Sequence, residues 1–221
     1  MPAARSKSPA RKSPSKAKKI DSESDGEAVP AAPAARGPSS TMIVKFAIFS
    51  ILLAVLIDHF GLEAKAEGLL NLKTAKRQAA FVGFAVWLTG LVMADAMLAV
   101  ARARMSIGLQ YPAVYAAGDD AESARFNRIQ RAHQNTLENI AMHFATLYCA
   151  YQRAPVIAAL GGIGFALGRK MFHDGYAVSV SSRQDGAPIR YLSMFVLQGF
   201  AALGWIEVLA PGVLFFRQYL P

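Results

Sequence analysis

The sequence of 221 residues has only one cysteine, Cys149, and four histidines. A single cysteine cannot form a disulfide within the chain, and the cysteine and histidines lack metal-site spacing, so neither a disulfide scaffold nor a metal centre is expected. Charged residues are also scarce at 18%, whereas 53% of the residues are hydrophobic and the mean hydropathy is +0.27. This composition excludes an ordinary soluble domain. Cys149 lies inside an apolar run, and we interpret it as a small buried hydrophobic residue rather than a catalytic nucleophile.

Large apolar residues are rare in the N-terminal segment, residues 1–41, which is rich in Ala, Pro, Ser and Lys. It holds eight basic and four acidic residues. We predict a disordered tail, because such a segment cannot bury enough apolar surface to fold. Its basic charge favours the cytosolic side of a membrane and attracts anionic lipid, whereas a nucleic-acid partner is not expected.

Beyond the tail, blocks of charge separate long apolar segments, which is typical of a multi-pass membrane protein. We expect an extra N-terminal anchor and linker over residues 42–78 and an all-α, four-helix membrane domain over residues 79–221. Asp95 interrupts the first span of this domain, and we expect it to pair with another group in the bundle. The four predicted spans are residues 79–102, 132–151, 156–178 and 189–216.

The first apolar run, residues 42–57, has three interpretations. It is long enough to act as a retained anchor helix once its flanks are included. It also resembles the apolar region of a late signal peptide, with Ala64-Lys65-Ala66 as the cleavage site. A bipartite organelle presequence is the third. We favour the retained anchor, because a signal peptide preceded by a long basic tail is atypical.

The polar residues at the start of the second predicted span carry the main functional signal. Arg131, Asn135 and Glu138 recur at i, i+4 and i+7, which places them on one helix face. Ionisable groups at bilayer depth each cost at least ~2.5 kcal/mol and normally face a polar cavity or the bundle interior. This face is therefore predicted to hold a polar, charged ligand. The alternative is a helix-entry network in which Arg131 extends to the membrane surface.

The run Phe126-Asn-Arg-Ile-Gln-Arg-Ala-His-Gln-Asn-Thr-Leu-Glu138 resembles the helix-2 signature of the MAPEG family, the membrane-associated proteins of eicosanoid and glutathione metabolism. It is most similar to the microsomal glutathione S-transferase 3 branch, and the resemblance covers roughly residues 82–205. It implies a homotrimer in the endoplasmic reticulum or another organelle membrane, with each glutathione site shared between neighbouring subunits. The basic ends of the loop between the first two shared helices, such as Arg102 and Arg128, fit a cytosolic location.

The resemblance also implies roles for individual residues. The helix-2 pattern assigns glutathione contacts to Arg131, His133, Asn135 and Glu138. Arg104, or Arg102 if the loop alignment shifts, is expected to bind a glutathione carboxylate.

Two further assignments come from the later helices. The run Arg169-Lys-Met-Phe-His-Asp-Gly-Tyr176 resembles a family pattern in which Tyr176 contacts glutathione and Arg169 supports the site. The cation that stabilises the glutathione thiolate is then Arg183, with Arg190 as the alternative. Phe172 departs from the usual Tyr or His, which predicts one ligand hydrogen bond fewer. Residues 139–142 also depart from the family pattern, which leaves the shape of the lipid-facing slot open.

Two classes of function follow. The first is a glutathione S-transferase or peroxidase that acts on a lipophilic electrophile or lipid hydroperoxide concentrated in the bilayer. The second is a non-catalytic lipid-binding scaffold similar to 5-lipoxygenase-activating protein. Arg131, Arg183 and Tyr176 favour the enzyme, because a lipid scaffold has no need of a cation beside a thiolate.

Overall fold

A computed structural model describes residues 40–210 and residue 212, and all of the regular structure in this part of the chain is helical. Residues 1–39 of the predicted tail and most of residues 211–216 of the last predicted span lie outside the described residues, whereas α1 already begins at Ser40. The elements are α1 (Ser40–His59), α2 (Leu62–Leu69), α3 (Ala75–Ser106), α4 (Ala121–Tyr151), α5 (Pro155–Val178), the 3-10 helix η1 (Ser181–Gln184) and α6 (Ala187–Leu209).

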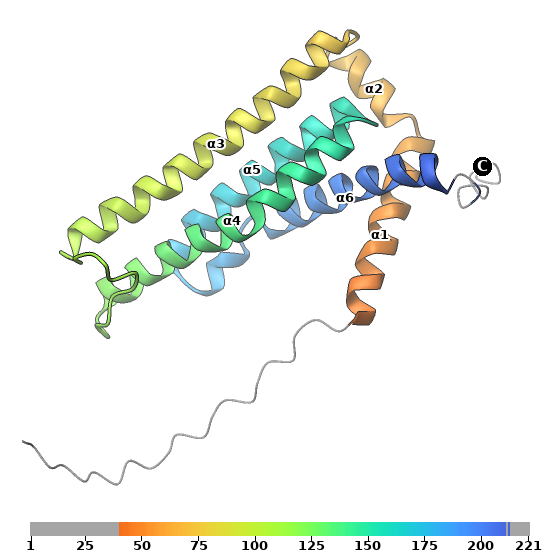
Figure 1. Cartoon of the computed structure of the whole chain (residues 1–221). Helices are drawn as coiled ribbons and strands as arrows, with labels where there is room; N and C mark the ends of the chain where they lie inside the picture. Colours follow the sequence, from red (N-terminus) through yellow and green to blue (C-terminus); the bar gives the residue numbers. More distant parts are fainter. Residues whose placement is uncertain (1–39, 211, 213–221) are drawn as a thin grey trace, which may run out of the picture. The chain divides into compact units, whose positions relative to one another are not determined.

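Helices α3 to α6 form a bundle in which α5 contacts α3, α4 and α6 (Figure 1). The largest buried cluster in the described residues lies where α4, α5 and α6 meet and includes Leu147, Ala158, Leu197 and Phe200, and Ala54 and Val55 of α1 pack into it. The predicted all-α membrane bundle is therefore confirmed, and α1 and α2 are additional to it.

The helices differ in how well their composition suits a bilayer. Helices α1, α3, α5 and α6 are each long and apolar enough to cross a membrane. Within the described residues α4 does not meet this criterion, because polar groups such as Arg131, Asn135 and Glu138 interrupt its apolar run. Its place in the bundle follows instead from its packing against α3, α5 and α6. The predicted span over residues 132–151 is the C-terminal part of this longer helix, which begins at Ala121.

Helix boundaries differ from the sequence prediction where side chains cap the helices. The α3 helix starts before the expected residue 79, because the Thr74 hydroxyl accepts a hydrogen bond from the Arg77 amide. The loop between α3 and α4 is shorter than the gap between the first two predicted spans, because Asp120 caps α4 by accepting bonds from the amides of Glu122 and Ser123, both at 2.9 Å. The Ser123 hydroxyl and these amides lower the pKa of Asp120. Short-range capping of this kind satisfies the unpaired amides of the first helical turn.

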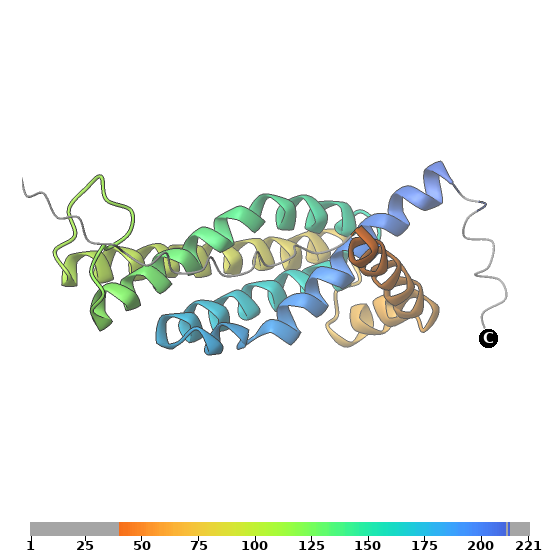
Figure 2. The same ribbon diagram turned by 90° about the horizontal axis from the view of Figure 1, so that it is seen from below.

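Helix α1 packs on α6 at a steep angle to the bundle (Figures 1 and 2). The two helices meet at Gly199, where a Cβ atom would lie 2.1 Å from the Ser50 carbonyl oxygen and 2.8 Å from the Ala54 Cβ. Only glycine permits this close approach. Ser50 and Ala54 are accordingly buried, while most of the α1 surface remains apolar and exposed.

Two other expectations have different outcomes. Cys149 is exposed, so its interpretation as a buried hydrophobe is wrong. The neighbouring positions Leu147 and Ala150 face the core, and the 3.6-residue period turns Cys149 away from it. Asp95 pairs inside the bundle as expected, with the Lys170 amine at 3.3 Å and the Arg102 guanidinium at 3.8 Å.

Candidate functional site

A polar cavity of about 340 Å³ opens where α4, α5, η1 and α6 meet. It gathers five of the residues selected from the sequence, together with three others. The lining residues are Arg131, Asn135, Phe172, Tyr176, Arg183, Gln184, Arg190 and Tyr191. The arginines thus come from three separate elements of the chain.

Glycines bring the start of α6 close to α5 and so place Arg190 in the cavity. A Cβ atom on Gly168 would lie 2.8 Å from the backbone nitrogen of Arg190, so α5 and α6 touch through their backbones here. Gly186 precedes α6 with a φ of +73°, and a Cβ there would lie 2.9 Å from the Gly168 carbonyl oxygen. Since a side chain at φ +73° is also strained, both positions favour glycine.

Another close approach positions Arg183. The η1 turn packs against α5 at Gly175, where a Cβ atom would lie 2.2 Å from the Ser182 carbonyl oxygen. The Ser179 hydroxyl accepts a hydrogen bond from the Ser182 amide at 3.0 Å and thereby closes the turn. Arg183 consequently lies at the exposed mouth of the cavity.

Two arginines lie deeper in the bundle and lack acidic partners. Arg169 is 5% exposed and Arg190 is 8% exposed, and neither forms an ion pair with a carboxylate in the described part of the chain. The ring of Phe172 lies close to both cations, with its centroid 5.7 Å from the Arg169 guanidinium carbon and 5.0 Å from that of Arg190. Ring contacts of this kind stabilise a cation without neutralising it. The site therefore retains uncompensated positive charge.

The α4 face carries the remaining polar groups in the expected register. The Asn135 side-chain oxygen accepts a hydrogen bond from Arg169 Nη1 at 2.8 Å. Arg131 Nη1 donates to Glu138 Oε1, also at 2.8 Å, and both of these side chains are about half exposed. Glu138 thus holds Arg131 rather than lining the cavity, and this ion pair is also what the helix-entry interpretation expects.

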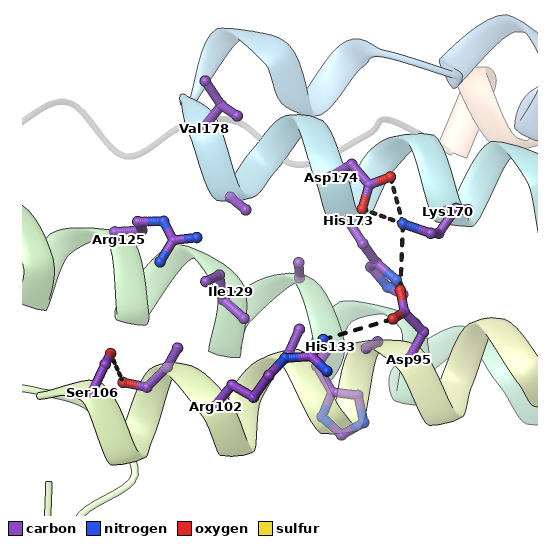
Figure 3. A pocket seen from close by; sticks show the side chains of 15 residues that line it. Asp95, Arg102, Ser106, Arg125, Ile129, His133, Lys170, His173, Asp174 and Val178 are labelled. Carbon is purple, nitrogen blue, oxygen red and sulfur yellow. Dashed lines mark hydrogen bonds and ion pairs between the residues drawn. The ribbon is translucent and has the colours of Figure 1, made fainter. Parts of the chain in front are cut away.

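Two residues that were expected to contact glutathione, Arg104 and His133, lie outside this cavity. Arg104 Nη1 donates to the Ala113 carbonyl oxygen at 2.7 Å, and its guanidinium stacks on Tyr111 and Phe126. His133 lines a different, larger groove between α3, α4 and α5 (Figure 3). Since His133 is two positions from Arg131, a helix directs it toward another face.

Gln184 and Tyr191 are cavity residues that the sequence did not indicate. Tyr191 follows Arg190 directly, but an aromatic residue at the start of an apolar helix resembles any other membrane-facing residue. An adjoining pouch of about 120 Å³ lies between α4, α5 and α6 and shares Asn135, Arg190 and Tyr191 with the cavity. Two of its residues, Asn139 and Met142, come from the segment 139–142, for which the sequence left the shape of a lipid-facing slot open. Its other lining residues are Asn139, Met142, His143, Thr146, Phe165, Arg169, Met194, Leu197 and Gln198.

Together, the apolar helices define a multi-pass membrane protein, and its polar cavity is lined by three arginines. The chain belongs to the MAPEG family, whose model matches residues 82–210, more than half of the sequence. It is also similar to an uncharacterized protein of Synechocystis sp., sll1147, with 34% identity over 99 residues. This match covers 44% of the chain and 68% of the cyanobacterial protein.

Proposed function

We propose that the protein is an integral-membrane glutathione transferase or peroxidase that acts on lipophilic electrophiles or lipid hydroperoxides. The observation that carries the proposal is the pair of buried arginines, Arg169 and Arg190, which have no carboxylate partner in the described chain and adjoin a cavity lined by further arginines. A buried cation without a counter-charge is costly to maintain, so a bound anion would stabilise it. Family membership supports glutathione as that anion.

The charges around the cavity are complementary to those of glutathione, which carries two carboxylates, one ammonium group and a thiol. Arg131 and Arg183 lie at the mouth, where their planar guanidinium groups can bind carboxylates through paired hydrogen bonds. Glu138 does not line the cavity, but its ion pair with Arg131 holds that arginine in position. Tyr176 and Asn135 add polar partners from α5 and α4.

We assign thiolate stabilisation to Arg190. When bound, glutathione supplies a thiol that reacts as its thiolate, and a nearby cation raises the thiolate fraction at neutral pH. Arg190 is buried, whereas Arg183 is exposed on η1. Since a cation acts more strongly at low effective dielectric, Arg190 is the better placed of the two, and Arg183 then serves as a carboxylate contact.

The adjoining pouch supports a lipophilic co-substrate. Its wall includes Phe165, Met194 and Leu197, and it opens between α4 and α6 beside the exposed side chains of Met142 and Tyr191. A molecule dissolved in the bilayer could enter there and reach Arg190, which lines both the pouch and the cavity. This arrangement favours an enzyme in which a polar and an apolar reactant meet at one arginine.

A homotrimer would explain why two residues expected to contact glutathione lie outside the cavity of their own chain. Arg104 and His133 are not among the cavity residues of their own chain. In a site shared between neighbouring subunits, they would be supplied to the cavity of the adjacent copy. We extend the proposal to this trimer, to the microsomal glutathione S-transferase 3 branch and to an endoplasmic reticulum membrane.

Ultraviolet difference spectroscopy of the detergent-solubilised protein with glutathione at neutral pH tests the proposal. The expected result is a thiolate band in the native chain that is lost in Arg190→Ala. The control Lys76→Ala removes an exposed cation at the start of α3, which does not line the cavity, and should retain the band. Loss of the band in Arg183→Ala alone would transfer the role to Arg183. If glutathione does not bind at all, the enzyme proposal fails and the lipid-binding scaffold takes its place.

A further inference from the structure

Helices α1 and α2 form the region for which the sequence left a retained anchor and a cleaved signal peptide open. The candidate cleavage site, Ala64-Lys65-Ala66, lies inside α2 (Leu62–Leu69). In the folded chain this site is therefore part of a regular helix and not of an exposed loop tip, where proteolytic cleavage is usual. The contacts of α1 and α2 with the bundle distinguish further between the two interpretations.

The buried face of α1 belongs to the core of the bundle. Ala54 and Val55 are 0% and 3% exposed and join the cluster that contains Phe200 of α6. At Gly199 the α6 backbone comes so close to α1 that any Cβ atom would overlap the Ser50 carbonyl oxygen. Since small residues permit close helix contact in lipid, α6 has a surface that fits α1.

Polar contacts join the same segment to three other parts of the bundle. Asp58, near the end of α1, pairs with Arg153 in the turn between α4 and α5, and Arg153 also pairs with Glu207 of α6. Glu63 of α2 accepts hydrogen bonds from the first amides of α5. Cleavage after Ala66 would remove both acids and leave these amides without that acceptor. The bundle thus depends on α1 and α2 to satisfy polar groups of its own.

Helices α1 and α6 run in the same general direction. Phe46 stacks on Phe195 with ring centroids 5.3 Å apart, and Ser50 lies against Gly199. Between these two contacts both helices advance by four residues, about one turn. The ends of the two helices then meet through Arg153. Since α6 begins at the cavity end of the bundle, the start of α1 is also the end nearer to the cavity (Figure 1).

We propose that α1 is retained as a fifth membrane span beside α3 to α6, and that it enters the membrane from the side on which the cavity opens. Helix α1 is long and apolar enough to cross a bilayer. Residues 1–41 contain eight basic residues, a bias that keeps the start of a span in the cytosol. The cavity mouth at Arg183 then faces the cytosol as well. The inference rests on contacts outside the cavity and does not depend on glutathione chemistry.

Tagging and thiol labelling of the full chain in sealed microsomes test both parts of the inference. The chain carries one epitope tag at each end, and the mature protein should keep both. In a Cys149→Ser background, Ser181→Cys on η1 and Lys76→Cys at the start of α3 each supply one exposed thiol, at opposite ends of the bundle. We expect external protease to remove the N-terminal tag and a membrane-impermeant maleimide to label Ser181→Cys. Lys76→Cys should react only after detergent opens the membrane.

A matched pair of glycine variants tests the packing of α1 on α6. Gly199→Ala forces the two helices apart and should lower the unfolding temperature in detergent by about 5 °C, as overpacking of a core does. Gly90→Ala on α3 has open space around its new Cβ atom. It should leave the unfolding temperature unchanged or raise it slightly, because alanine favours a helix.

Three results would overturn the inference. Loss of the N-terminal tag from the mature chain would show that α1 is removed. Protection of that tag from external protease would show that α1 does not enter from the cytosolic side. Equal unfolding temperatures for Gly199→Ala and Gly90→Ala would contradict the packing of α1 on α6. The thiolate band of the native chain is measured separately, so failure of the proposed enzyme function would leave these results and their interpretation unchanged.

Discussion

Arginines whose side chains are largely covered occur in two regions of the bundle, and the two regions treat them differently. Arg153, after the end of α4, has a side chain only 16% exposed and pairs with Asp58 at 3.2 Å and Glu207 at 2.8 Å. Arg169 and Arg190 are more fully buried but have no acidic partner in the described chain. A carboxylate is thus supplied where an arginine joins helices and is absent where a ligand is proposed to bind.

An acidic residue is also placed against a positive group of the fold at the start of α5. Glu63 of α2 accepts hydrogen bonds from the amides of Val156 and Ile157, both at 2.8 Å, and thereby caps α5. The N-cap residue of α5, Ala154, provides no side-chain acceptor of its own. Since helix N-termini carry partial positive charge, Glu63 again places an acid against a structural positive group. The α1–α2 segment supplies both this cap and Asp58, and so interacts closely with the bundle.

The largest predicted effect comes from removing the uncompensated charge. Arg190→Ala should lower glutathione turnover by about 10²- to 10³-fold, the usual cost of deleting one electrostatic group that acts on the reacting centre. Its thermal stability should not fall, because the side chain has no carboxylate that would be left unpaired. Steady-state kinetics and a thermal unfolding curve in detergent measure the two effects.

The result that would contradict this prediction for Arg190→Ala is a loss of stability without a loss of turnover. A large loss of stability with normal turnover in the remaining folded protein would show that Arg190 is structural, and the contrast with Arg153 would then disappear. Arg190→Lys provides a matched control, because it keeps the positive charge while removing the planar guanidinium group.

For Arg153, substitution should lower the stability of the protein but leave its affinity for glutathione unchanged. Arg153→Ala leaves Asp58 and Glu207 without this partner. Because these pairs are only partly buried, we expect a loss of about 1.5–3 kcal/mol, the range for hydrogen bonds to charged groups, rather than the larger cost of breaking a fully buried pair. We expect a clear fall in the unfolding temperature in detergent. The glutathione affinity of the folded fraction should stay at the native value, and a matching loss of affinity would contradict the separation of the two regions.

The cap on α5 predicts a smaller change. Glu63→Ala removes the acceptor for two amides and should destabilise the protein by about 1 kcal/mol, in the range measured for lost helix caps. Hydrogen exchange should then accelerate at the amides of Val156 and Ile157. Glu67→Ala on the same short helix is the control, and equal acceleration in both variants would indicate that α2 as a whole, not the cap, protects α5.

The sequence predicted the parts of this architecture that depend on periodicity and local pattern. Arg131 and Asn135 share a helix face and a cavity because three to four residues make one turn. The sequence could not predict the approach of Arg190 to Phe172, which depends on backbone contact between Gly168 and α6 over a separation of more than twenty residues. It likewise misjudged Cys149, because an apolar run in a membrane helix does not distinguish a lipid-facing position from a core position.

The smallest predicted effect concerns the acid that caps α4. The pKa of Asp120 is lowered in the fold by the Ser123 hydroxyl and by backbone amides, so its ionised form is the one that the fold favours. This contribution is complete above the unfolded pKa of about 3.9 and is lost as the pH falls through the lower folded value. Far-ultraviolet circular dichroism between about pH 5 and pH 2 should therefore show a small loss of helix that is reduced in Asp120→Ala, which lacks the titrating group. Asp119→Ala, which removes the neighbouring carboxylate, should retain the native pH profile. If Asp120→Ala also retained it, the carboxylate would have no stabilising role at this helix end, and acids placed against positive structural groups would then be limited to the end of the bundle that holds Arg153 and Glu63.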